Sequence, residues 1–167
     1  MMNDLKVNPE IVSLQLAAWM GSAAAICELV ATGTDPNARG RDGLMSLHCA
    51  VISHKLDAMV ALFECGAAVD GSDEFGRTPL HCAAQYSSQR PLALLLDRGA
   101  SVEASDGRGR TPLHYAVLAS NVAAVKLLVR NGADAQTQDY AGKTPADFAR
   151  LSGSRVVAAI FDAANWQ

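Results

Sequence analysis

The tetrapeptide Thr78-Pro79-Leu80-His81 returns as Thr111-Pro112-Leu113-His114, 33 residues further along the chain (111 − 78 = 33). The same step backward reaches Met45-Ser46-Leu47-His48, and the same step forward reaches Thr144-Pro145-Ala146-Asp147. A second backward step reaches Val12-Ser13-Leu14-Gln15, a degenerate copy that keeps the leucine. A fixed period of this length is the sequence signature of a protein built from stacked units.

Further columns of residues keep the same register without an insertion. One column is alanine, another is leucine ending in phenylalanine, and two are glycine. They are Ala17, Ala50, Ala83, Ala116 and Ala149; Leu29, Leu62, Leu95, Leu128 and Phe161; Gly33, Gly66, Gly99 and Gly132; and Gly43, Gly76, Gly109 and Gly142. Because so many columns stay in phase, the repeat extends over about residues 8 to 164.

Each unit carries the local signals of two helices followed by a turn. The Thr78 hydroxyl can cap a helix, and Pro79 suits the first helical position, where an N–H has no partner inside the helix. A polar column just before the second apolar helix predicts another cap. Its members are Ser22, Ser88, Asn121 and Ser154. The glycine column that begins at Gly33 predicts helix ends with positive φ, and the polar stretch 70–76 predicts a tight turn or hairpin.

The period, the Thr-Pro-Leu-His core and the glycine-alanine pair after the second helix resemble the ankyrin repeat. This resemblance implies an all-α solenoid of antiparallel helix pairs, with short β-hairpin fingers along one edge. It predicts a single domain, 1–167, of five units at about 8–40, 41–73, 74–106, 107–139 and 140–167. Gln15 and Asp147 replace the histidine in the first and last units, as expected of terminal units whose outer faces meet water.

Composition narrows the function classes. Half of the 167 residues are apolar and the net charge is −3, which disfavours a general polyanion binder. The four cysteines form no CxxC pair, so we expect no zinc site, no cofactor and reduced thiols in a cytosolic or nuclear setting. The apolar run 14–27 is too short for a membrane span, and we interpret it as a buried helix pair.

No residue pattern indicates an active site, so we expect a protein that is not an enzyme. A histidine recurs with the period, at His48, His81 and His114. Such a row could be interpreted as a series of metal-binding sites. Successive helix layers lie about 10 Å apart, whereas a shared zinc needs bonds of about 2 Å. The family resemblance implies instead that this histidine forms hydrogen bonds in the turn that links repeats.

The resemblance also implies which positions the scaffold leaves free to contact a partner. Arginine and tyrosine at such positions are typical of interface hot spots. The candidate contact residues are Arg41, Leu44, Phe75, Arg77, Gln85, Tyr86, Arg108, Arg110, Leu118, Tyr140 and Lys143. We expect a protein partner, for which an acidic segment is a candidate feature, and a chain that is monomeric alone. In the alternative interpretation, these cations only pair with Asp73, Glu74, Asp106 and Asp139 on a solvated edge.

Two further hypotheses remain open. The Arg77, Arg110 and Lys143 edge could serve a nucleic-acid-associated regulator, although the acidic residues in the fingers outnumber the cations there. Asn37 follows Asp35 and Pro36 in a stretch that resembles the site modified by asparaginyl hydroxylases in ankyrin repeats. The other interpretation of Asn37 is a plain hairpin asparagine.

Overall fold

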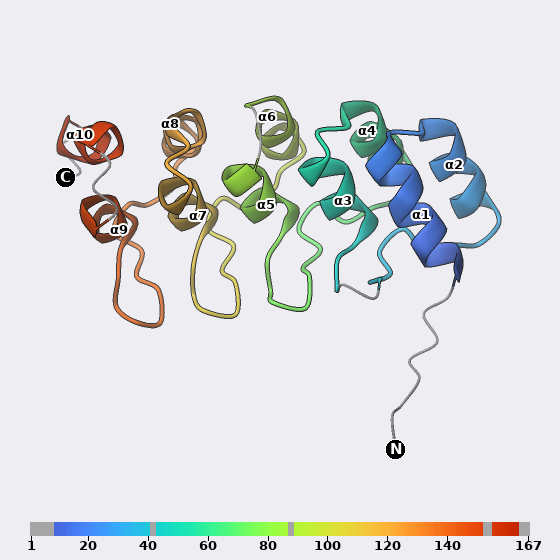
Figure 1. Cartoon of the computed structure of the whole chain (residues 1–167), viewed down its shortest axis with the longest axis horizontal. Helices are drawn as coiled ribbons and strands as arrows, with labels where there is room; N and C mark the ends of the chain where they lie inside the picture. The colour runs from blue at the N-terminus through green and yellow to red at the C-terminus, as the bar shows by residue number, and fades with distance from the viewer. Residues whose placement is uncertain (1–8, 41–42, 87–88, 152–154, 164–167) are drawn as a thin grey trace, which may run out of the picture.

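The computed structural model describes residues 9–40, 43–86, 89–151 and 155–163. These residues form ten helices, in which each odd-numbered helix is followed by its even-numbered partner (Figure 1). The helices are α1 (Pro9–Met20), α2 (Ala23–Ala31), α3 (Ser46–Ile52), α4 (Leu56–Glu64), α5 (Pro79–Tyr86), α6 (Gln89–Asp97), α7 (Pro112–Leu118), α8 (Val122–Arg130), α9 (Pro145–Leu151) and α10 (Arg155–Ala163). The predicted all-α solenoid of helix pairs is therefore confirmed.

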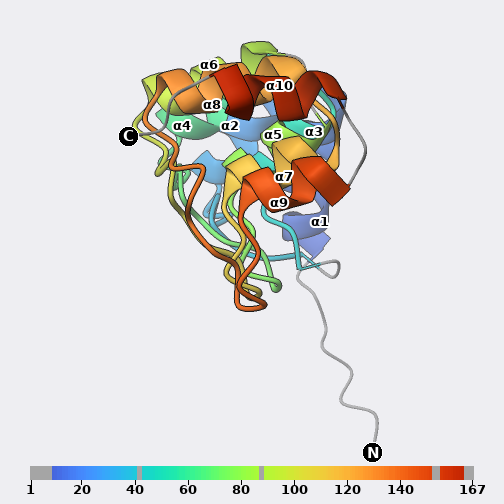
Figure 2. The same ribbon diagram turned by 90° about the vertical axis from the view of Figure 1, so that its left-hand side faces the viewer.

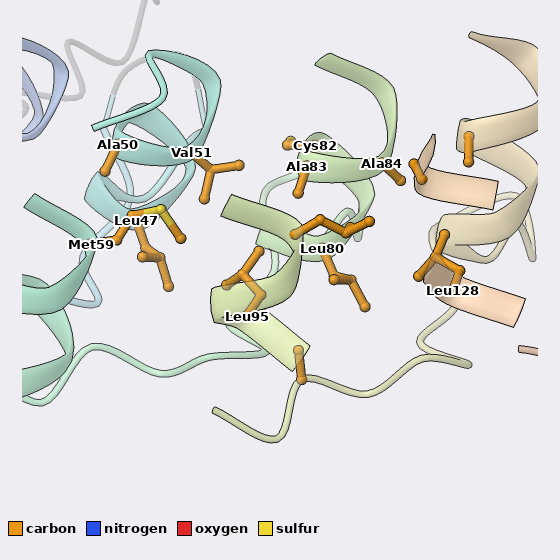
Figure 3. Close-up of a cluster of buried hydrophobic side chains, with 14 of the residues drawn as sticks. Leu47, Ala50, Val51, Met59, Leu80, Cys82, Ala83, Ala84, Leu95 and Leu128 are labelled. Carbon is orange, nitrogen blue, oxygen red and sulfur yellow. The ribbon is translucent and has the colours of Figure 1, made fainter. Parts of the chain in front are cut away.

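The helices lie in two rows. The odd-numbered helices form an inner row, next to the loops that project from one edge, and the even-numbered helices form an outer row (Figures 1 and 2). Buried leucines from both rows meet between them, among them Leu47, Leu80, Leu95 and Leu128 (Figure 3). The alanine column is also buried, as at Ala83, and its small side chains let neighbouring inner helices approach closely.

The predicted helix boundaries follow local capping rules. The side chains of Ser22 and Asn121 accept hydrogen bonds from backbone N–H groups in the first turns of α2 and α8. Ser88 and Ser154 lie outside the described residues. The glycines after the outer helices all have positive φ, for example +107° at Gly33, a conformation in which a Cβ would be strained.

The sequence analysis missed a second left-handed position, in the turn between the two helices of a pair. Gly21 holds this position with φ of +86°, and His54 and Ser120 hold it with φ of 58° and 53°. Glycine adopts this conformation readily, histidine is enriched in it among the other residues, and serine is not. The turn geometry is therefore imposed by the packing of the two helices rather than by the local sequence.

The predicted β-hairpin fingers are tight turns in this structure. In the described part of the chain there is no strand, only one isolated bridge between Arg39 and Met45. A finger is closed instead by two backbone hydrogen bonds, as from the Asp73 N–H to the Arg77 carbonyl at 2.9 Å and from the Gly76 N–H to the Asp73 carbonyl at 3.1 Å. Both bonds lie within the turn from Asp73 to Arg77, so they do not extend into a ladder of paired residues.

The apolar run 14–27 spans the latter part of α1, the Gly21 turn and the first part of α2, but it is not wholly buried as we expected. Leu14 and Ile26 are buried, whereas Trp19 and Met20 are exposed. The difference arises because the first inner helix has a neighbouring inner helix, α3, on one side only among the described residues.

The second unit departs from the Thr-Pro pattern at the start of α3. Met45 adopts an extended conformation, with φ of −97° and ψ of 160°, and its side chain makes no cap hydrogen bond. The Met45 side chain fills the space beside Gly71, where an added Cβ would lie 2.5 Å from its terminal methyl. The neighbouring Ser46 hydroxyl is buried and has no hydrogen-bond partner. Such a group weakens the fold because its desolvation is not compensated.

We predict that Ser46→Pro stabilises the protein by about 1 kcal/mol. Proline fits the first helical position, Met45 already has the extended backbone that precedes proline, and the orphaned hydroxyl is removed. Thermal unfolding should show a higher Tm than for the wild type. Ser46→Ala is the matched control because it removes the hydroxyl alone, so its gain should be smaller. A Tm for Ser46→Pro at or below that of Ser46→Ala contradicts this explanation.

Candidate partner-binding site

The three inner histidines are fully buried, and each bonds in two directions. On one side, the Nδ1 atom lies 3.0 Å from the backbone nitrogen of Thr78 in the case of His81, and 3.1 Å from that of Thr111 in the case of His114. On the other side, Nε2 lies 2.9 Å from the Arg110 carbonyl for His81 and 3.1 Å from the Lys143 carbonyl for His114.

These partners fix the protonation state of the rings. A backbone N–H can only donate and a carbonyl can only accept, so Nδ1 is the acceptor and Nε2 carries the hydrogen. Burial lowers the pKa of His48, His81 and His114 below the ordinary value of 6.5. The rings are therefore neutral structural groups that connect neighbouring units. The described residues contain no cluster of three or more residues suited to a metal ion.

Inside each finger, a buried aspartate organises the turn. One carboxylate oxygen of Asp106 accepts hydrogen bonds from the N–H groups of Arg108 and Arg110, both at 2.8 Å. Asp73 and Asp139 hold the same position in the fingers before and after it. Burial alone would raise the pKa of Asp106, but these N–H groups and the Tyr115 hydroxyl hold its pKa below the ordinary value. The ionised carboxylate thus fixes the backbone of the finger.

The second carboxylate oxygen of each aspartate decides where the arginines lie. Arg77 Nε lies 2.7 Å from Asp73 in its own finger. The equivalent oxygen of Asp106 accepts instead from the Tyr115 hydroxyl, at 2.8 Å. Arg110 reaches Asp139 of the next finger instead, at 3.4 Å. Residue 82 holds the column of Tyr115 one unit earlier and is a cysteine, which leaves Asp73 available to Arg77.

The predicted row of cations is therefore not a row of uncommitted charges. The Arg77 and Arg110 side chains are half-buried beside carboxylates, as in the alternative interpretation, and their guanidinium groups also lie over the rings of Phe75 and Phe148. Arg108 and Lys143 are exposed. Arg41 lies outside the described residues.

Neighbouring fingers are joined through their backbones. The Gly107 N–H donates to the Phe75 carbonyl at 2.8 Å, and the Tyr140 N–H donates to the Arg108 carbonyl at 2.9 Å. Between the fingers lies a groove of about 550 Å³. Its lining residues include three of the predicted contact residues, Phe75, Arg77 and Arg108, together with Tyr115, which the sequence analysis did not select.

Predicted contact residues outside the groove differ in exposure. Tyr140 is 80% exposed, and Tyr86 and Leu118 at the ends of inner helices are also exposed. Gln85 and Leu44 are half-buried, and the Leu44 carbonyl accepts a hydrogen bond from Gln15.

The sequence analysis missed Trp19, which stands 33 residues before Ile52 and 66 before Gln85. Trp19 is 48% exposed at the end of α1, and the adjacent Met20 is also exposed. The period itself is a signal for both residues, because it places Trp19 in the column of Ile52 and Gln85.

Asn37 belongs to a column of side chains that brace successive turns. Its Oδ1 atom accepts the Ala68 N–H at 2.7 Å, and its Nδ2 atom donates to the Gly66 carbonyl at 3.1 Å. Asp70 and Glu103, which hold the same column, accept backbone N–H groups one unit further on. The asparagine amide therefore contributes to the contact between the first two units.

Comparisons with known protein families agree with this architecture. A family model described as "Ankyrin repeats (3 copies)" matches residues 14–106, and one described as "Ankyrin repeats (many copies)" matches residues 95–149. No curated protein matches the chain. No helix among the described residues has both the length and the apolar character needed to cross a membrane.

The histidine network predicts a loss of stability in mild acid. Between pH 7.5 and 5.5 the unfolded chain binds protons at these histidines, whereas the folded chain resists protonation because the folded pKa values are lowered. The free energy of unfolding should therefore decrease as the pH is lowered, by at most about 1.4 kcal/mol per histidine and pH unit. Urea unfolding at a series of pH values measures this slope.

His81→Gln is the matched variant, since Gln15 already makes the equivalent bond to a carbonyl without titrating. This variant should be less stable at pH 7.5, because Nδ1 is lost as an acceptor, but it should show a shallower dependence on pH. An unchanged slope would mean that His81 does not contribute to the acid sensitivity.

Proposed function

The chain belongs to the ankyrin-repeat family, and we propose that it is a non-catalytic scaffold that binds a partner protein along its fingers and inner helices. Ankyrin repeats generally mediate protein–protein interaction. The observation that carries the proposal is the exposure of large apolar side chains on braced fingers. Phe75 is 59% exposed beside the groove, and the exposed Tyr140 lies on the finger two units further along the chain.

The rigidity of the fingers favours binding. The buried aspartates and the backbone bonds between fingers hold Phe75 and Tyr140 in place before a partner arrives. A preorganised surface loses little conformational entropy on association, so more of the contact energy appears as affinity. Exposed aromatic rings on such a surface are typical of hot spots.

Fewer cations are available to a partner than the sequence suggested. Arg77 and Arg110 are partly neutralised by Asp73 and Asp139, which weakens the case for a phosphate-binding edge and for the nucleic-acid alternative. Arg108 and Lys143 are exposed and are the cations that we propose meet an acidic segment of the partner. Exposed rim charges mainly accelerate association. An adaptor and an inhibitor could use this surface equally well.

Arg77 is unsuitable for testing the surface by charge reversal. A glutamate there would face the buried Asp73 carboxylate, which would lose its arginine partner. Such a change would destabilise the fold, contrary to the expectation that this column lies outside the packed structure. The aromatic residues make cleaner probes because their side chains are exposed.

We predict that Phe75→Ala combined with Tyr140→Ala lowers recovery of specific partners by at least about tenfold. The immobilised full chain is exposed to an extract of the cells that express it, and retained proteins are quantified by mass spectrometry. Lys126→Glu combined with Arg130→Glu is the control, because these exposed side chains lie on α8 in the outer row.

Proteins that are retained by the wild type and the control, but lost from the aromatic double variant, support the proposal. Loss from the control with retention by the double variant contradicts it. Retention that depends steeply on salt and disappears after nuclease treatment would favour the nucleic-acid alternative.

We propose separately that Asn37 is a site of asparaginyl hydroxylation. Hydroxylation at Cβ would leave the amide atoms that bond to Ala68 and Gly66 intact, so the modified chain can keep the same fold. Peptide mass spectrometry of natively expressed protein should show a gain of one oxygen atom on the peptide containing Asn37. Asn37→Gln is the control, and the added oxygen should be absent from it. An unmodified wild-type peptide would dismiss the proposal.

A further inference from the structure

Two cysteine thiols meet between the first two units of the outer row. The Sγ atoms of Cys27, in α2, and Cys65, at the end of α4, are 3.9 Å apart, and the Cys65 S–H donates toward Cys27. Cys27 is exposed and Cys65 is half-buried, while the other two cysteines, Cys49 and Cys82, are buried. The pair is therefore accessible to reagents in solution.

This arrangement occurs at one interface only. Cys27 and Cys65 are 38 residues apart, one period plus five. The equivalent pairs at the next two interfaces are Val60 with Arg98 and Ala93 with Asn131. The scaffold thus brings these two columns toward each other by repetition, but it pairs two thiols only where the first unit meets the second.

We propose that Cys27 and Cys65 form a reversible disulfide that fastens the first unit to the second. A disulfide bond is about 2.05 Å long, so the two sulfurs must approach by about 2 Å. Because one thiol is on a helix surface and the other is at a helix end, rotation of the two side chains can supply most of this movement.

The oxidant is a low-molecular-weight disulfide of the glutathione class. The Cys27 thiolate attacks one sulfur of this disulfide, forms a mixed disulfide and releases one thiol. Cys65 then loses its proton and attacks the Cys27 sulfur, which releases the second thiol. In total, one external disulfide and two cysteine thiols become two external thiols and one protein disulfide, with two electrons passing to the oxidant.

The surroundings assign the order of attack. Exposure makes Cys27 the thiol that meets the oxidant first. Burial, and then the hydrogen bond to Cys27, raise the pKa of Cys65, so Cys65 stays protonated until the mixed disulfide forms beside it. Burial raises the pKa of Cys82 to about 12, which makes that thiol a poor competitor.

The disulfide would stabilise the first unit most. A terminal unit of a solenoid packs against fewer neighbours than an internal unit. Closing a loop of 38 residues restricts the unfolded chain and leaves the folded contacts between α2 and α4 in place.

The full-length protein is incubated with a series of oxidised-to-reduced glutathione ratios. Intact mass spectrometry should show the loss of two hydrogens, peptide mapping should find Cys27 linked to Cys65, and Tm should rise by about 5 to 10 °C and fall back on reduction. Cys65→Ser should stop at the glutathione adduct on Cys27 and show no such rise.

Cys27→Ser is the complementary control, because Cys65 then has no partner, and it should not gain thermal stability on oxidation. Two outcomes overturn the proposal. One is a wild-type protein that accumulates the glutathione adduct on Cys27 without forming the link. The other is a link that forms between different cysteines.

Discussion

One hydrogen-bonded imidazole in each inner unit holds the structure together. A neutral ring has a single donor and a single acceptor, and both are used here. His81, for example, accepts from the start of its own helix and donates to a carbonyl in the following finger. The interaction at the start of a helix is thus coupled to the one that stacks the next unit.

The candidate binding surface depends on the same interaction. The carbonyl that receives the histidine bond belongs to Arg110, whose N–H is held in turn by Asp106. Histidine, backbone and aspartate therefore form one continuous connection from the buried inner row to the exposed finger. A finger held in this way can present an aromatic side chain in water without collapsing onto the core, and Phe75 and Tyr140 are presented in this manner.

Features governed by local rules could be predicted from the sequence, whereas features that depend on competition between units could not. The helices, the capping residues Ser22 and Asn121 and the terminal glycines follow from local backbone chemistry. The partner of Arg110 does not follow from local chemistry, because Asp106 lies in its own finger and Asp139 in the next, and only the stacking of the units shows that Arg110 pairs with Asp139 while the Tyr115 hydroxyl donates to Asp106. The same limit explains why the sequence left open whether the arginines contact a partner or pair with the aspartates.

The two end units show that the histidine has two separable roles. Gln15 donates to the Leu44 carbonyl, as His48 does to the Arg77 carbonyl, and so keeps the contact between units. Asp147 accepts from the Thr144 N–H and hydroxyl and so keeps the helix cap. A glutamine amide can donate to a carbonyl, whereas an ionised carboxylate can only accept. The imidazole of each inner unit performs both roles at once, whereas the ionised Asp147 carboxylate can accept at the cap but cannot donate to a carbonyl of a following unit.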